Sequence, residues 1–173
     1  MKIVIRGRPG VGKTTAVIKL ATRLESLGFP LAGFYTEELM EDTHRIGFRV
    51  ATLHQRAAVT FAHVNLDTPH KVGRYSVDVD SFERVALPSL DPPSAKEIVI
   101  VDEIGKMELF SKRFQGAMEE LFSSPNTVVA TIPTKPISFV RNLLRRSSPT
   151  VMDINFENRE TIVDEIISLI EHE

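Results

Sequence analysis

Cysteine is absent from the 173 residues of this chain. Its absence excludes a disulfide framework, a thiolate metal site and a cysteine nucleophile. The five histidines, at positions 44, 54, 63, 70 and 172, lack the spacing of a zinc site. No apolar run approaches the roughly 18 residues of a membrane span, and no secretory signal pattern is visible. We therefore expect a soluble, cytoplasmic protein without a membrane partner.

A strong excess of one charge is also lacking. The formal net charge is −2 at pH 7, so no overall basic field exists to attract nucleic acid. Nucleic acid is therefore not an expected partner, although Arg141, Arg145 and Arg146 leave a local basic patch as an alternative. Hydrophobic residues make up 42% of the chain, which is sufficient for one core. We expect one domain over residues 1–173 and a monomer.

The most informative motif that is present is GRPGVGKT at residues 7–14, a full match to the phosphate-binding pattern G-x-x-x-x-G-K-[ST]. A short β-branched run precedes it and apolar residues at helical spacing follow it, so the motif joins a strand to a helix. In such a loop the backbone N–H groups and the helix N-terminus converge on phosphates. Lys13 is expected to reach the outer phosphates, and Thr14 to offer its hydroxyl to Mg²⁺. The predicted nucleotide-binding residues are Gly7, Arg8, Pro9, Gly10, Val11, Gly12, Lys13, Thr14 and Thr15.

The order of predicted elements indicates an α/β fold, a three-layer sandwich around a mostly parallel central sheet. Strand and helix alternate from about residue 95 onward, which specifies right-handed crossovers. Before this alternation, three β-rich runs predict an inserted β meander at residues 31–36, 45–53 and 57–63.

Several local boundaries follow from the same patterns. We predict a turn over residues 37–44, a loop over 64–76, a helix over 80–87 capped by Asp80, a helix over 109–122 and a helix from Asn158 to the C-terminus.

Residues 97–102 read EIVIVD, an aliphatic run typical of a strand that is covered on both faces of a parallel sheet. The final carboxylate would emerge at the C-terminal edge of the sheet, where the phosphate loop also lies. We interpret Asp102 as the Walker B aspartate, which would hold Mg²⁺ together with Thr14, in part through water. An aspartate that caps the next helix is the alternative.

Glu103 directly follows that aspartate and can be aimed at the γ-phosphate, where it would orient and deprotonate an attacking water. We predict Glu103 and Lys13 as catalytic residues. The second predicted nucleotide-binding stretch is Asp102, Glu103, Ile104, Gly105 and Lys106. Residues 102–105 also fit the D-x-x-G pattern of switch GTPases, but the guanine-reading tetrad N-K-x-D does not occur in the chain.

Two further roles stay open at this stage. An arginine could neutralise the charge that develops in the transition state. The candidates are Arg8, Arg45, Arg74, Arg141 and Arg145, and the sequence does not distinguish between them. A loop over residues 155–159 is well placed to hold the base and ribose. Within it, Phe156 either stacks on a base or packs in the core.

With the phosphate loop and the stretch VDEIGKMEL at residues 101–109, the chain resembles the small thermophile-type nucleoside-triphosphatase family, to which relatives of the human cancer-related nucleoside triphosphatase belong. GFYTE at 33–37, RIGF at 45–48 and ENR at 157–159 support the resemblance. It implies Mg²⁺-dependent hydrolysis of ATP, GTP and other nucleoside triphosphates to the diphosphate and phosphate, with Glu103 as the base. Arg74 stands where the family often has lysine.

Three other functions are weighed against hydrolysis. A small-molecule or nucleoside kinase is disfavoured by the Asp102–Glu103 pair and by the lack of an arginine-rich lid. A nucleotide-dependent switch that acts on RNA or a protein partner would use hydrolysis as a timer. A structural domain with a vestigial site would bind no nucleotide.

Overall fold

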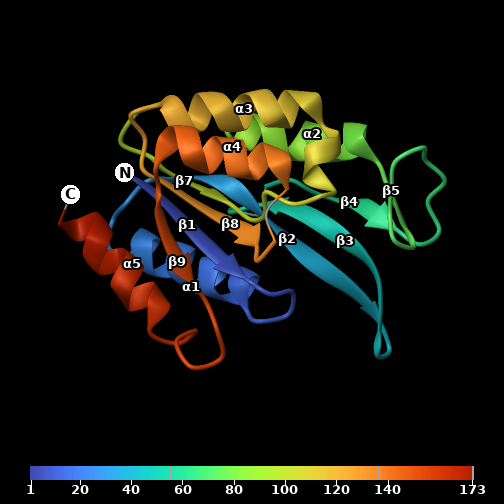
Figure 1. Ribbon diagram of the computed structural model, residues 1–173, viewed down its shortest axis with the longest axis horizontal. Helices are drawn as coiled ribbons and strands as arrows, with labels where there is room; N and C mark the ends of the chain where they lie inside the picture. The colour runs from blue at the N-terminus through green and yellow to red at the C-terminus, as the bar shows by residue number, and fades with distance from the viewer. Residues whose placement is uncertain (55, 136, 173) are drawn as a thin grey trace.

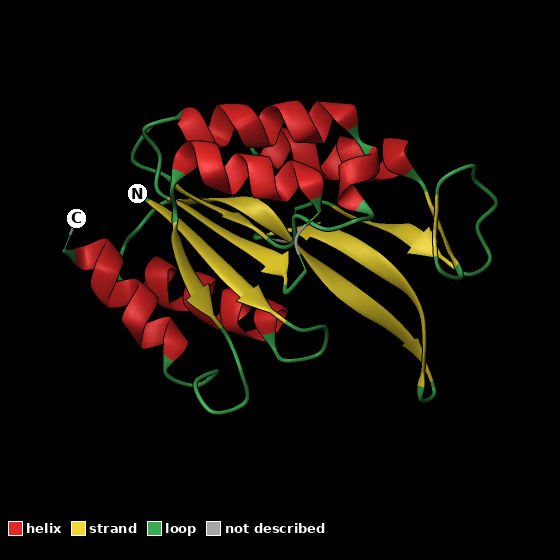
Figure 2. Ribbon diagram, in the orientation of Figure 1, coloured by secondary structure: helices red, strands yellow, loops and turns green. Residues whose placement is uncertain are grey.

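The chain folds around one β-sheet with helices packed on both of its faces, as the computed structural model shows for residues 1–54, 56–135 and 137–172 (Figure 1). Within these residues the sheet has nine strands in the order β5-β6-β4-β3-β2-β7-β8-β1-β9. Figure 2 shows the resulting three layers, with the sheet between two sets of helices. The predicted three-layer α/β class is confirmed.

Five neighbouring strands form the parallel part of the sheet, in the order β2-β7-β8-β1-β9. Parallel strands with helices on both faces are buried on both sides and are therefore continuously apolar. Ile98–Val101 follows this rule, since all four residues are buried. The strands are β1 (Lys2–Gly7), β2 (Leu31–Glu41), β7 (Ile98–Val101), β8 (Val128–Pro133) and β9 (Thr150–Asp153).

The other part of the sheet is antiparallel and grows from β2. It contains β3 (His44–Thr52), β4 (Ala58–His63), β5 (Lys71–Val72) and β6 (Tyr75–Val77). The pairing of β2 with β3 and of β3 with β4 confirms the predicted meander.

Two predicted boundaries in this part are wrong. The expected turn over residues 37–44 is strand up to Glu41, because Glu37 pairs across the ladder with Arg49 and compensates its charge. The expected loop over 64–76 contains β5 and β6, where Tyr75 is buried against the ring of Phe48.

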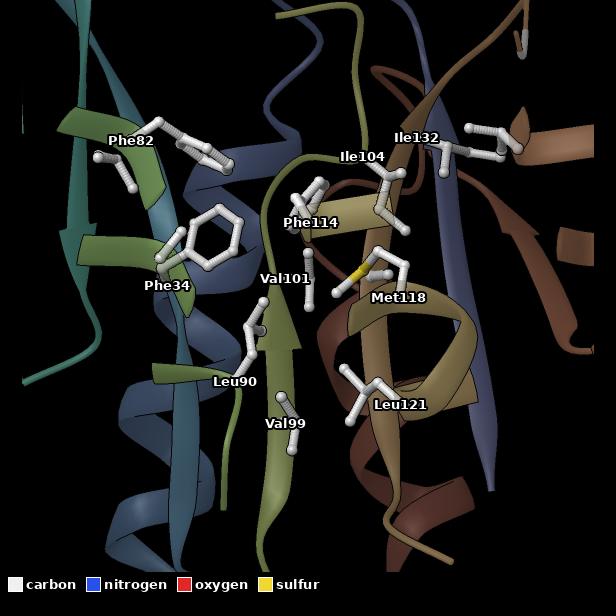
Figure 3. Packing of buried hydrophobic residues seen from close by; sticks show 14 of the residues in the cluster. Phe34, Phe82, Leu90, Val99, Val101, Ile104, Phe114, Met118, Leu121 and Ile132 are labelled. Carbon is white, nitrogen blue, oxygen red and sulfur yellow. The ribbon is translucent and has the colours of Figure 1, made fainter. Parts of the chain in front are cut away.

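The helices divide between the two faces of the sheet. Helices α1 (Lys13–Ser26) and α5 (Ile162–Glu171) cover one face, and α2 (Val79–Ser89), α3 (Lys112–Ser123) and α4 (Ser138–Ser147) cover the other (Figure 1). Phe34 of β2, Phe82 of α2 and Phe114 of α3 meet edge to face, beside Val99 and Val101 of β7 (Figure 3). None of the helices in the described ranges is both long and apolar enough to span a bilayer.

Three predicted helix starts differ from the structure. The N-cap of α2 is Asp78 and not Asp80, because the Asp78 carboxylate accepts the Ser81 N–H at 3.0 Å. Helix α3 begins at Lys112, after the 3₁₀ turn Glu108–Phe110. Helix α5 begins at Ile162 and not at Asn158, because hydrogen bonds to its own asparagine side chains hold the preceding loop in a non-helical conformation. The helix ends at Glu171, and position 173 lies outside the described residues.

Candidate functional site

The predicted phosphate loop leaves the C-terminal end of β1 and enters α1. Gly10 and Gly12 have φ values of 75° and 108°, a left-handed region that costs glycine little and lets the chain reverse tightly. The Gly12 carbonyl accepts the Ala16 N–H at 2.9 Å, which closes the first turn of α1 directly behind the loop. The backbone therefore presents the N-terminus of a 14-residue helix at the sheet edge.

Lys13 connects this loop to the predicted catalytic carboxylate. Its side chain is only 8% exposed, and its Nζ donates to the carbonyls of Gly7 and Arg8 at 3.1 and 3.3 Å. The same Nζ lies 3.1 Å from Oε2 of Glu103. One ammonium group thus lies between the loop carbonyls and the acidic pair.

Asp102 is buried at the end of β7 and is held by hydroxyls from two other elements. Thr14 Oγ1 of α1 donates to Oδ2 at 2.6 Å, and Thr131 Oγ1 of β8 donates to Oδ1 at 2.5 Å. The backbone of Thr36 in β2 also hydrogen-bonds to the carboxylate. Burial raises the pKa of Asp102, and these hydrogen bonds together with the charge of Lys13 oppose that shift.

Glu103 is less enclosed than Asp102, with 27% of its side chain exposed. Burial raises its pKa, the Lys13 ammonium lowers it, and the Asp102 charge raises it again. A carboxylate whose proton affinity is raised and which keeps access to solvent is suited to accept a proton from water.

A second glutamate lies on the far side of Gly105. A Cβ atom at Gly105 would come within 2.8 Å of Glu108 Oε2 and 2.9 Å of Glu103 Oε1, so glycine is required for the two carboxyl groups to approach its Cα. Glu108 is 6% exposed. Burial and the nearby Glu103 charge raise its pKa to about 8, so Glu108 carries a proton at neutral pH.

The structure brings Lys13, Thr14, Asp102 and Glu103 together. The other predicted residues divide by exposure. Val11 and Ile104 are buried in the hydrophobic clusters, and Gly7 and Gly105 are buried beside them. The exposed members are Arg8, Pro9, Gly10, Thr15 and Lys106.

The donor set fits a hard divalent cation such as Mg²⁺. Thr14 and Asp102 contribute a hydroxyl and a carboxylate oxygen that already lie 2.6 Å apart, and Mg²⁺ binds oxygen and retains several waters. In the described part of the chain, no group of three or more His, Asp or Glu residues could by itself hold a metal. Phosphate and water oxygens would therefore have to complete the coordination shell.

Two of the arginine candidates are engaged away from the acidic pair. Arg45 Nε donates to the Tyr75 hydroxyl at 3.1 Å, and its guanidinium forms an ion pair with Glu38. Arg74 donates to the Arg45 carbonyl and lies over the Tyr75 ring. Through these contacts both arginines pack β3 against the β5–β6 segment.

Two residues at the site escaped sequence reasoning. Thr131 is the polar member of the strand VVATIP, and a hydroxyl in a fully buried strand is a signal that could have been used. Glu108 lies in a stretch of mixed polarity, DEIGKMEL, where no periodicity reveals that its side chain turns inward.

Beside the phosphate loop is a hollow of about 240 Å³. Its walls come from the first turns of α1 and from the loop that follows β9. The lining residues are Gly12, Thr15, Ala16, Lys19, Arg159 and Glu160.

A strand, a glycine-rich loop and a helix, facing an acidic strand end in a parallel sheet, define the class of P-loop nucleotide-binding domains. A sequence model of the family described as NTPase matches residues 2–167, and the chain belongs to this family.

Similarity to individual members extends over nearly the whole chain. The nucleoside-triphosphatase THEP1 of Thermotoga sp. (strain RQ2) is 41% identical over 171 residues, which cover 98% of this chain and 95% of the relative. The human cancer-related nucleoside-triphosphatase is 37% identical over 183 residues, at 98% and 96% coverage. The crystal structure of THEP1 from Aquifex aeolicus superposes with a TM-score of 0.87 at 38% identity, covering 99% of both chains.

Proposed function

We propose that this protein hydrolyses nucleoside triphosphates to the diphosphate and phosphate, with Mg²⁺ at Thr14 and Asp102 and with Glu103 as the base that activates water. Membership of the NTPase family and the names of its relatives support the reaction class. The observation that carries the residue roles is the Lys13 ammonium, which lies 3.1 Å from Glu103 and beside the loop carbonyls.

In this mechanism the phosphate loop binds and orients the triphosphate through its backbone N–H groups. Bound Mg²⁺ would supply a positive charge that withdraws electron density from the phosphate oxygens. Lys13 would exchange its loop carbonyls for phosphate oxygens and remain near Glu103. Glu103 then holds a water and accepts its proton at a carboxylate oxygen while the water oxygen bonds to the γ-phosphorus and the bond from that phosphorus to the nucleoside diphosphate breaks. The carboxylate is restored when the proton leaves to solvent through its exposed edge.

Phosphate release from purified protein with Mg²⁺ and a single nucleoside triphosphate tests the reaction without a second substrate. We expect E103Q to lower kcat by about 10²- to 10⁴-fold, because the amide keeps the shape but cannot accept the proton. Nucleotide binding by E103Q, measured by isothermal calorimetry, should persist.

The matched control is E120Q, which changes an exposed glutamate on α3 and should leave kcat unaltered. Equal kcat values for the wild type and E103Q would contradict the assignment of the base. Phosphate release that requires an added acceptor would instead support the kinase alternative.

A further inference from the structure

We propose that Phe156 and Arg159, in the loop after β9, form a stacking platform for the base of the bound nucleotide. The proposal rests on the proposed function in one respect, namely that the phosphate loop holds the phosphates of a nucleotide. It assigns the part of the site that recognises the nucleoside, which the acidic pair and the phosphate loop do not reach.

The order of the strands indicates in which direction along the sheet edge a bound nucleotide would extend. β7, which carries the acidic pair, lies two strands from β1 on one side, and β9 is the neighbour of β1 on the other. The terminal phosphate must lie toward Asp102 and Glu103 if water is to be activated there. The nucleoside end therefore extends in the opposite direction, toward the loop that follows β9.

That loop contacts the phosphate loop at both of its ends. Ile154 N donates to the carbonyl of Arg6 at 2.9 Å, directly before the phosphate loop begins. At the other end, the Arg159 side chain would lie 3.9 Å from a Cβ atom at Gly12. At this second contact, Arg159 and Glu160 border the hollow on α1 together with Thr15 and Lys19, which is the space that a nucleoside leaving the phosphate loop would enter.

Phe156 is 72% exposed, although large hydrophobic side chains elsewhere in this domain are mostly buried. This exposure rules out the alternative that it packs in the core. The Arg159 guanidinium lies 5.5 Å from the centre of the Phe156 ring. A planar cation beside an exposed aromatic ring provides the two surfaces on which nucleobases stack.

The loop is held in place before any ligand binds. The Asn155 amide oxygen accepts the N–H groups of Glu157 and Asn158 at 2.8 and 3.0 Å. Asn158 in turn accepts from Asn155 N and donates to the Asp153 carbonyl, both at 2.8 Å. A platform with a fixed backbone loses little conformational entropy when a base stacks on it.

The same contacts predict a broad base preference. The amide atoms of Asn158 and the amide oxygen of Asn155 are engaged within the loop and are not directed at a base edge. Stacking tolerates every base because each has a π-face. We expect KM values for ATP, GTP, CTP and UTP within about 10-fold of one another.

A fluorescence experiment reads the platform directly, because the natural chain contains no tryptophan. F156W introduces a single indole at the proposed stacking position. With Mg²⁺ present, we expect its emission to be quenched by ADP, GDP, CDP and UDP, and to be unaffected by inorganic tripolyphosphate, which lacks a base. The control L27W places an indole at the exposed far end of α1, where ADP should cause no quenching.

Steady-state kinetics provide the second measurement. F156A should raise KM for ATP by about 5- to 100-fold, which is the effect of removing one stacked base contact. The value of kcat should not change, because the base is remote from the reacting phosphate. R159A should raise KM in the same direction, and L27A should not change it.

The outcomes separate this proposal from the proposed function. Quenching of F156W by ADP together with an absence of hydrolysis would support the platform and contradict the hydrolase. Hydrolysis with an unchanged KM in F156A, or quenching by tripolyphosphate equal to that by ADP, would overturn the platform and leave the hydrolase intact.

Discussion

Gly105 separates two carboxyl groups that differ in their contact with solvent. Glu103 retains an exposed edge and faces Lys13, whereas Glu108 is enclosed and lies near the Glu103 charge. Burial raises the pKa of both groups, but at Glu103 the Lys13 charge opposes the shift, whereas at Glu108 the Glu103 charge adds to it and the pKa reaches about 8.

Replacement of Glu108 by glutamine should change how stability depends on pH. The folded protein holds the Glu108 proton up to about pH 8, while the unfolded chain releases it near 4.5. Between these values the folded state binds more protons, so the unfolding free energy falls as pH rises and levels off above pH 8. E108Q stays neutral and lacks this component, worth about 1.4 kcal/mol per pKa unit.

Urea unfolding at pH 5 and pH 8 measures the effect. The loss of unfolding free energy between the two pH values should be smaller by several kcal/mol in E108Q than in the wild type. Glu108 interacts electrostatically with Glu103 and Asp102, so the difference between the two proteins includes this coupling as well as the titration of Glu108 itself. Equal losses would show that Glu108 does not titrate in this range.

For individual residues, the sequence was sufficient to predict those that belong to local motifs. Lys13 and Thr14 are fixed by the loop pattern, and Asp102 by its place at the end of an aliphatic strand. Thr131 and Glu108 escaped because their roles depend on which strands become neighbours and on which way a short 3₁₀ turn directs its side chain. Such tertiary information is not present in local periodicity.

Among the elements, α2 shows how a cap is distinguished from a nearby acidic residue. The Asp78 carboxylate accepts both the N–H and the hydroxyl of Ser81, at 3.0 and 2.6 Å. The bonds from Ser81 lower the pKa of Asp78. Asp80, two residues on, is exposed in the first turn and contributes only through the helix dipole.

D78A should therefore lower the unfolding free energy by about 1 kcal/mol, within a range of roughly 0.5–2 kcal/mol. D80A is the matched control and should change it by less than about 0.5 kcal/mol. Chemical denaturation at neutral pH gives both values. A larger loss in D80A than in D78A would restore Asp80 as the cap.

The limits of β2 show why boundaries are harder to predict than elements. Glu37 and Glu38 suggest a polar turn when they are considered alone. In the structure, both carboxylates form ion pairs with arginines on β3. The pairing partner decides whether a polar stretch is strand or turn. The parallel strands needed no such information, since their apolar runs reflect burial on both faces.

Over the whole molecule, the candidate site joins elements that are distant in sequence. The loop after β1, the ends of β7 and β8, and the loop after β9 meet at one edge of the sheet. A ligand that binds them together binds the folded state only and must therefore stabilise the fold.

Mg²⁺ and ADP at about 100 times the dissociation constant should raise the unfolding free energy by about 2.7 kcal/mol. For a chain of this length, this corresponds to a rise in Tm of roughly 5–10 °C. Differential scanning calorimetry with excess EDTA should show most of the rise removed, and K13A should show little rise in either condition. An equal rise with EDTA would contradict the metal at Thr14 and Asp102.

The position of β8 between β1 and β7 determines which changes in sequence the site can tolerate. Two inter-strand steps, about 10 Å in all, separate the strand that carries the glycine loop from the strand that carries the acids. Main-chain hydrogen bonds fix that span, so it does not depend on which side chains fill the core. Core composition can therefore change while the distance across the proposed reacting centre stays constant. In contrast, deletion of one residue of β8 before Thr131 would shift the register of Thr131 by one and turn its hydroxyl away from Asp102, although neither motif is changed.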